Sequence, residues 1–225
     1  MWSGQGSYAE AMHNRLVASI AACVALVSFL PGCASESVTS SSTTTSTNAV
    51  VGPEWAAAQQ QARALAAATS ARLAVMPDVA YAKFVSGAAV DDPVREEQAA
   101  AAFVATTTAG GVPADIAAAV INDQFTAAKA VQRSLIGQWT AGTRPTPSTP
   151  PADLTTELRP RIDAATTALA NALIAVEQDG VPADWSSFMA DAAAAVTLPE
   201  DQGVSRADYD LALPTLLALP PSSAS

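Results

Sequence analysis

Long alanine-rich runs, interrupted by proline and glycine, restrict what this chain can fold into more than any other feature. Alanine has the highest intrinsic helix propensity, and its small side chain lets neighbouring helices approach closely. No run alternates apolar and polar residues long enough to indicate a β-sheet. We therefore expect an all-α fold built as a single helical bundle.

Proline and aspartate divide the expected bundle into helices. The first helix is expected over 54–76, where Pro77 should kink or end it, with a short continuation through 79–84. Asp92 followed by Pro93 is typical of a helix start, with the aspartate as N-cap. The other expected helices cover 93–108, 112–139 and 153–178, with a proline-rich linker over 140–152 and shorter helices around 187–196 and 206–213.

The N-terminal residues have the layout of an export signal. A short basic start at 13–15 precedes an apolar run over 16–30. This run is shorter than the roughly 20 residues needed to span a bilayer, so we favour a cleaved signal over a permanent transmembrane helix. We expect translation to start at Met12 and the signal peptide to occupy 1–32.

Cys33 is the expected lipid attachment site. It follows Leu30 and Gly32 at positions minus three and minus one, which resembles a bacterial lipobox. Plain secretion without a lipid is the alternative. The Ser/Thr-rich residues 33–52 are expected to form a disordered tether, and the helical domain then occupies 53–225. We expect the protein in the bacterial cell envelope or periplasm, anchored to the membrane only through this lipid, or secreted.

Charge and missing side chains exclude several kinds of chemistry. The chain has 11 Lys and Arg against 21 Asp and Glu, a formal net charge of −10, so we do not expect a nucleic acid partner. The one histidine, His13, and the two cysteines, Cys23 and Cys33, belong to the signal or its cleavage site. A processed chain therefore has no His for a nucleophile–base pair and no Cys/His cluster for zinc. Catalysis would rely on carboxylates, amides, Lys and Arg, and we expect no metal.

The few cations are the candidates for function. Arg72 and Lys83 are 11 positions apart, which leaves them about 20° apart around an uninterrupted helix. Arg95 is expected in a first helical turn, where free backbone N–H groups also favour an anion. Arg159 is expected at the opening of the next long helix after the linker. These positions indicate an anion pocket, although such cations can also be solvated or paired with acids such as Glu96.

The order and spacing of these residues resemble the all-helical class of chorismate mutases. The pattern consists of Arg72, Lys83, Asp92, Arg95 and Glu96, with Gln132 one helix later. The segment 158–163, LRPRID, resembles the exported, periplasmic form of that family. The resemblance covers about 65–177 and implies the helical bundle of this family, with a C-terminal helical extension over 185–225.

The resemblance implies conversion of chorismate to prephenate, a Claisen rearrangement inside one bound molecule that needs no cofactor. The enzyme must hold a flexible dicarboxylate in its reactive conformer and place donors near the ether oxygen. By similarity, Arg72, Arg95 and Arg159 would bind the carboxylates. Lys83 and Gln132 would donate to the ether oxygen, so that Lys83, Gln132 and Arg95 are the expected catalytic residues.

Asp92 and Glu96 correspond to positions that contact the substrate hydroxyl, although Asp92 could equally serve as a helix cap. Gln98 and Gln124 are further candidates for polar contacts.

Two positions depart from the family pattern. Ala128 replaces a small hydroxyl residue, and Ala99 stands where exported relatives can have Gln. The family also allows a homodimer. The alternatives to an enzyme are a non-enzymatic helical envelope lipoprotein and a module that binds a dicarboxylate without reacting it.

Overall fold

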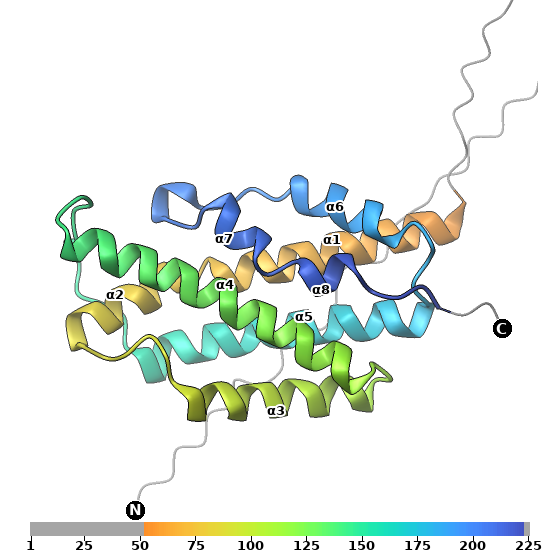
Figure 1. Cartoon of the computed structure of the whole chain (residues 1–225), viewed down its shortest axis with the longest axis horizontal. Helices are drawn as coiled ribbons and strands as arrows, with labels where there is room; N and C mark the ends of the chain where they lie inside the picture. The colour runs from red at the N-terminus through yellow and green to blue at the C-terminus, as the bar shows by residue number, and fades with distance from the viewer. Residues whose placement is uncertain (1–51, 223–225) are drawn as a thin grey trace, which may run out of the picture. The chain divides into compact units, whose positions relative to one another are not determined.

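The computed structural model describes residues 52–222, and this part of the chain forms a helical bundle without strands (Figure 1). The all-α class expected from the sequence is confirmed. The expected signal peptide, Cys33 and nearly all of the tether lie outside the described residues. None of the helices within 52–222 is long and apolar enough to cross a membrane.

The described residues form eight α-helices and two short helical turns. They are α1 (Pro53–Leu73), α2 (Met76–Ser86), α3 (Pro93–Ala109), α4 (Ala114–Thr140), the π-turn η1 (Leu154–Leu158), α5 (Arg159–Asp179), α6 (Trp185–Ala194), the 3₁₀ turn η2 (Glu200–Gln202), α7 (Arg206–Asp210) and α8 (Pro214–Leu217).

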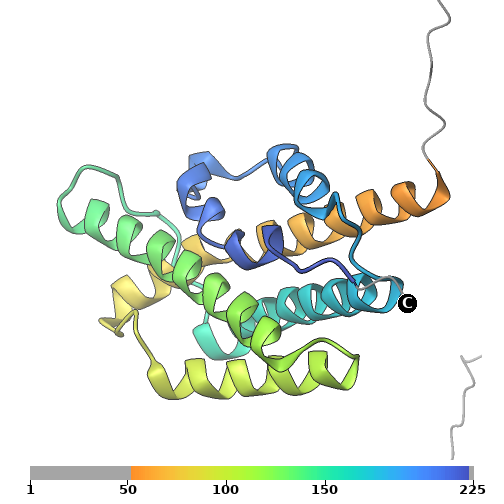
Figure 2. The ribbon, with the colours of Figure 1, turned by 45° about the vertical axis from the view of Figure 1, so that its right-hand side comes forward.

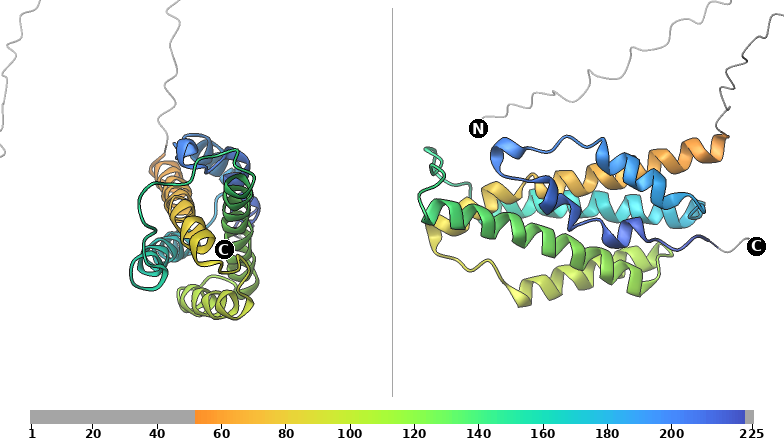
Figure 3. Two further views of the ribbon diagram at one scale, coloured as in Figure 1. Left: turned by 90° about the vertical axis from the view of Figure 1, so that its left-hand side faces the viewer. Right: turned by 45° about the horizontal axis from the view of Figure 1, so that its top comes forward.

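The long helices surround a common centre. Viewed along the bundle, α1 with α2, then α4, α3 and α5 follow one another around it (Figure 3, left). Helix α1 packs against α5, whereas α4 is contacted by both α2 and α3. Helix α3 also contacts α5. Side chains with no measurable exposure include Leu65 on α1, Ile121 on α4 and Leu169 on α5.

Two predicted helix boundaries have a clear local cause. Helix α1 ends at Leu73, four residues before Pro77. A proline ring clashes with the carbonyl four positions earlier, so the helix breaks there and α2 begins at Met76. Asp92 is the N-cap of α3, because its Oδ1 accepts a hydrogen bond from the backbone N–H of Arg95 at 3.2 Å. The predicted break and cap are both confirmed, although the break lies at 74–75 and Pro77 stands in the first turn of α2.

The C-terminal segment folds back over α1 and α4 (Figure 2). The indole N–H of the buried Trp185 donates to the main-chain oxygen of Leu216 at 2.7 Å. The Tyr209 hydroxyl donates to the main-chain oxygen of Ala66 on α1 at 3.1 Å. The helix expected over 206–213 is shorter than predicted: α7 ends at Asp210, and a separate helix, α8, starts at Pro214. A proline at the first position of a helix is favourable, so Pro214 begins a new helix instead of continuing α7.

Candidate functional site

One cavity of about 440 Å³ is lined by residues from α1, α2, α3, α4, η1 and α5. All seven candidate site residues of the sequence analysis lie on its wall: Arg72, Lys83, Asp92, Arg95, Glu96, Gln132 and Arg159. The fold thus brings to one place side chains that the sequence spreads over five helices and the loop before α3.

Arg72 is buried in this wall, with only 4% of its surface exposed. Its Nη1 donates to the main-chain oxygen of Gln124 at 3.0 Å, and its Nε donates to Thr166 Oγ1 at 3.3 Å. The guanidinium lies 5.5 Å from the centre of the Phe125 ring. Within the described residues no carboxylate forms an ion pair with it. Burial lowers the pKa of Arg72 to about 10, and a buried cation is costly unless an anion accompanies it.

Lys83 lies on α2, near the loop that leads to α3. Its Nζ donates to the main-chain oxygen of Val90 at 2.9 Å, which orients the ammonium and leaves two of its three hydrogens for a ligand. Burial lowers the pKa of Lys83, and the nearby carboxylates of Asp92 and Glu96 partly oppose this effect. The Arg159 guanidinium adds a smaller lowering of its own. Lys83 is therefore a partly desolvated donor.

Gln132 projects from α4 and is 5% exposed. Its Nε2 donates to the main-chain oxygen of Ala128 at 3.1 Å and lies 3.5 Å from Met76 Sδ. A thioether sulfur is a weak acceptor, so the second amide hydrogen can be given to an oxygen of a ligand. Gln132 is suited to donate into the cavity at any ordinary pH.

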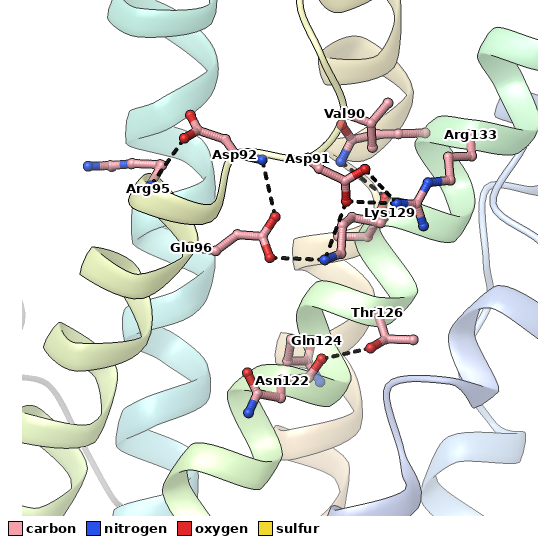
Figure 4. Close-up of polar contacts among 12 residues, drawn as sticks. Val90, Asp91, Asp92, Arg95, Glu96, Asn122, Gln124, Thr126, Lys129 and Arg133 are labelled. Carbon is pink, nitrogen blue, oxygen red and sulfur yellow. Dashed lines mark hydrogen bonds and ion pairs between the residues drawn. The ribbon is translucent and has the colours of Figure 1, made fainter.

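Asp92 and Glu96 are held by hydrogen bonds at the start of α3 (Figure 4). Besides capping the helix, Asp92 offers its backbone N–H to Glu96 Oε1 at 3.3 Å. The other carboxylate oxygen of Glu96 lies 2.9 Å from Lys129 Nζ. Asp92 thus has the structural role that the sequence left open, and it also reaches the cavity wall.

Arg95 and Arg159 approach the cavity from two neighbouring helices. Arg95 Nη2 lies 3.8 Å from Asp163 Oδ1, a pair whose side chains are 45% and 65% exposed and which therefore contributes little stability. Arg159 Nη1 contacts Thr155 Oγ1 at 3.4 Å, near the limit of a hydrogen bond. Both guanidinium groups can therefore turn toward an anionic ligand at small cost.

Arg159 owes its place to the turn that precedes α5. Asp153 caps this turn, because its Oδ1 accepts from the backbone N–H groups of Thr155 at 2.9 Å and Thr156 at 2.7 Å. These hydrogen bonds lower the pKa of the Asp153 carboxyl. The π-turn that follows then places Arg159 as the first residue of α5.

The cavity wall also contains residues that the sequence analysis did not select. Among them are two charged residues, Lys129 and Asp163, and the two residues that contact Arg72, Phe125 and Thr166. A helical spacing could have indicated two of them, since Lys129 lies three positions before Gln132 and Asp163 lies four positions after Arg159.

The structure separates into two groups the four other positions that the sequence indicated, Gln98, Ala99, Gln124 and Ala128. Gln98, Ala99 and Ala128 line the cavity. Gln124 does not: it points to the C-terminal segment, where its Nε2 donates to the main-chain oxygen of Ala212 at 3.0 Å.

This arrangement favours binding of a small anion with several oxygens over hydrolysis by a nucleophile. Guanidinium, ammonium and amide donors converge on one partly buried cavity, where electrostatic interactions are stronger than in water. In residues 52–222, no group of three or more His, Cys, Asp or Glu is placed to hold a metal ion.

No protein-family model and no curated protein matches the sequence. The structure is similar to the crystal structure of chorismate mutase from Burkholderia thailandensis, with 30% sequence identity and a TM-score of 0.63. The match covers 70% of this chain and 99% of that chain.

The chain belongs to the chorismate mutase family.

A second member of this family with a similar structure is the chorismate mutase from Burkholderia phymatum. It is 28% identical with a TM-score of 0.62, and the match covers 71% of this chain and 98% of that one. A secreted chorismate mutase from Yersinia pestis is 20% identical, with a TM-score of 0.53 and coverage of 70% and 94%. At that identity the Yersinia enzyme supports the fold alone.

Proposed function

We propose that this protein is an exported chorismate mutase that converts chorismate to prephenate without a cofactor. The observation that carries the proposal is Arg72, a buried guanidinium without a carboxylate partner among the described residues, in the same cavity as Lys83 and Gln132. A module that only bound a dicarboxylate would need no donors beyond the arginines. The presence of two further donors, Lys83 and Gln132, therefore favours a reaction at an oxygen that lies between the two carboxylates.

Binding and orientation of the substrate come first in the proposed mechanism. Arg72, Arg95 and Arg159 bind the two carboxylates, and Arg suits this task because its planar fork can donate two parallel hydrogen bonds to one carboxylate. Three cations on separate helices fix both ends of the dianion. This holds it in the compact conformer in which the bond-forming carbons meet, and so lowers the entropic part of the barrier.

Stabilisation of the transition state is assigned to Lys83 and Gln132. As the C–O bond breaks, negative charge develops on the ether oxygen, and donors that are already oriented stabilise that charge more than they stabilise the substrate. Lys83 is oriented by Val90 and Gln132 by Ala128. Asp92 and Glu96 bind the substrate hydroxyl. No proton leaves and no nucleophile attacks, so a site without His or Cys can perform the reaction.

All seven proposed site residues come from one chain, so a second subunit is not needed to complete this cavity. A homodimer, which the family allows, would then act on stability or regulation instead of supplying a site residue. We place the enzyme outside the cytoplasm because of the export signal layout at 1–32, with Cys33 as the lipid attachment site.

Turnover of chorismate by the purified protein tests the proposed function. We expect the absorbance of chorismate to disappear as prephenate forms. Lys83→Ala and Arg95→Ala should each lower kcat/KM by about 10² or more, because each removes a charged donor from a site shielded from water. Arg63→Ala is the matched control, since Arg63 is an exposed arginine of α1 that does not line the cavity. A folded protein that leaves chorismate unchanged would contradict the proposal and favour the binding module.

A further inference from the structure

Lys129 lies on the cavity wall and contacts two acidic side chains, Glu96 on the same wall and Asp91, which does not line the cavity (Figure 4). Its Nζ is 2.9 Å from Glu96 Oε2 and 3.6 Å from Asp91 Oδ1. The Lys129 and Glu96 side chains are 24% and 28% exposed, so this pair is partly shielded from water. By contrast, the neighbouring pair of Arg133 with Asp91 is 57% and 54% exposed. The contact with Glu96 is therefore the less screened of the two ion pairs.

The formal charges on the cavity wall show what the ion pair between Lys129 and Glu96 contributes. Within the described residues, the wall contains five cations, Arg72, Lys83, Arg95, Lys129 and Arg159, and three carboxylates, Asp92, Glu96 and Asp163. The formal balance is thus +2, which is equal and opposite to the charge of a dicarboxylate. Without Lys129 the balance falls to +1, and Glu96 becomes an uncompensated anion beside the ligand.

We propose that Lys129 is a positioning residue that neutralises and holds Glu96, so that the cavity accepts a doubly charged anion. The inference rests on the proposed function, since it concerns the same site. Lys129 is engaged by two carboxylates, and it therefore affects the substrate and the transition state through a similar electrostatic field. An interaction of that kind lowers KM and leaves kcat nearly unchanged.

The test compares Lys129 variants of the purified full chain in chorismate turnover. For Lys129→Met we expect KM to rise about tenfold, with kcat within about threefold of the original value. Lys129→Arg keeps the positive charge, so its KM should stay within about threefold of the value of the unaltered protein. Lys129→Gln is a second neutral variant, and thermal melting followed by circular dichroism shows that each variant is folded. An unchanged KM in the neutral variants, or a loss confined to kcat, would overturn the inference.

Arg133→Met is the matched control. Arg133 donates to both oxygens of Asp91 at 2.7 Å but does not line the cavity. We expect its KM to stay unchanged, and an equal rise would show that the effect arises at Asp91. Lys129→Met is also made in a Glu96→Gln background, with the Glu96→Gln single variant as the reference. No carboxylate is then left at position 96 for Lys129 to neutralise, so the substitution should raise KM by clearly less than the tenfold expected in the original protein. An equal tenfold rise in that background would also overturn the inference.

The two proposals fail in different ways. If the unaltered protein does not turn over chorismate, the proposed function is wrong. Calorimetric binding of chorismate to the unaltered chain and to Lys129→Met then tests the inference alone. A ratio of about ten between the two dissociation constants supports the role of Lys129, and equal constants overturn it.

Discussion

At the scale of single residues, burial makes Lys83 easier to deprotonate than an ordinary lysine. Its pKa is lowered from 10.5 by burial, and the carboxylates of Asp92 and Glu96 only partly oppose this. The protonated ammonium is the form that donates to the ether oxygen, so activity exists below its pKa and is lost as pH rises through it. We therefore expect kcat/KM to decline at a lower pH than the titration of an exposed lysine would give.

A profile of kcat/KM from about pH 7 to about pH 11 measures this decline, because kcat/KM reports ionisations of the free enzyme. Lys83→Arg is the informative control. The ordinary pKa of a guanidinium is well above that of an ammonium, so the alkaline decline should move upward even if the overall rate falls, as far as the pKa of about 10 of the buried Arg72. The same decline in both proteins would assign it to another group and contradict the role of Lys83.

Burial of the Arg72 guanidinium in the cavity wall lowers the stability of the folded protein. Its guanidinium has lost most of its water, and its two hydrogen bonds go to a main-chain oxygen and to a threonine hydroxyl instead of a carboxylate. Hydrogen bonds to neutral groups replace hydration only in part. The protein thus keeps an unfavourable charge that a bound carboxylate would compensate, which is typical of a site preorganised for its ligand.

At the scale of elements, Asp92 combines a structural role with a proposed role in binding. Asp92→Ala removes the N-cap of α3 and should lower the free energy of unfolding by about 1 kcal/mol. Asp92→Asn keeps an oxygen that can cap the helix, so its stability should change by only a few tenths of a kcal/mol. Denaturant unfolding measures both values.

The kinetics of the two Asp92 variants separate the roles. If the carboxylate contacts the substrate, Asp92→Asn should raise KM although the protein is nearly as stable as the original. If Asp92 only caps α3, Asp92→Asn should have normal kinetics, and that result would remove it from the proposed binding residues.

Local signals explain which elements the sequence could predict. Pro77 and the Asp92–Pro93 pair act on their own helix, so the break before α2 and the start of α3 follow from sequence alone. The division of the C-terminal segment into α7 and α8 was not predicted. Pro214 is a local signal for the start of α8, but the end of α7 at Asp210 and the packing of this segment on α1 and α4 depend on tertiary contacts.

The distinction between local signals and tertiary contacts also applies to the residues of the candidate site. The seven candidates were found through the order of a family pattern, and all of them line the cavity. The spacing from Gln132 can place Lys129 on the cavity side of α4, but its ion pair with Glu96, 33 positions earlier, depends on the packing of α3 on α4. The position of Gln124 in the sequence makes it a candidate for a polar contact with the ligand, but its side chain faces the C-terminal segment, which sequence order alone does not show.

At the scale of the whole molecule, the proposed catalytic site and the proposed membrane attachment belong to separate parts of the chain. Every proposed site residue lies between Arg72 and Arg159, within the described bundle. The proposed lipid attachment at Cys33 and the Ser/Thr-rich stretch after it precede this bundle in sequence. Anchoring should therefore determine where the enzyme acts without changing how fast it acts.

Cys33→Ser tests this separation. In a bacterial host, cell fractionation should find the unaltered protein with the membranes and Cys33→Ser in the soluble extracytoplasmic or medium fraction, because serine cannot carry the thioether-linked lipid. Its kcat and KM should match those of the unaltered protein within error. Cys23→Ser is the matched control: Cys23 follows Ile20 and two alanines, a weaker form of the same pattern, and its variant should remain with the membranes. If Cys33→Ser also stays with the membranes while Cys23→Ser is released, the lipid attachment site is Cys23. If neither variant changes location, membrane association does not require a lipid at either cysteine, and the apolar run at 16–30 is then the next segment to delete.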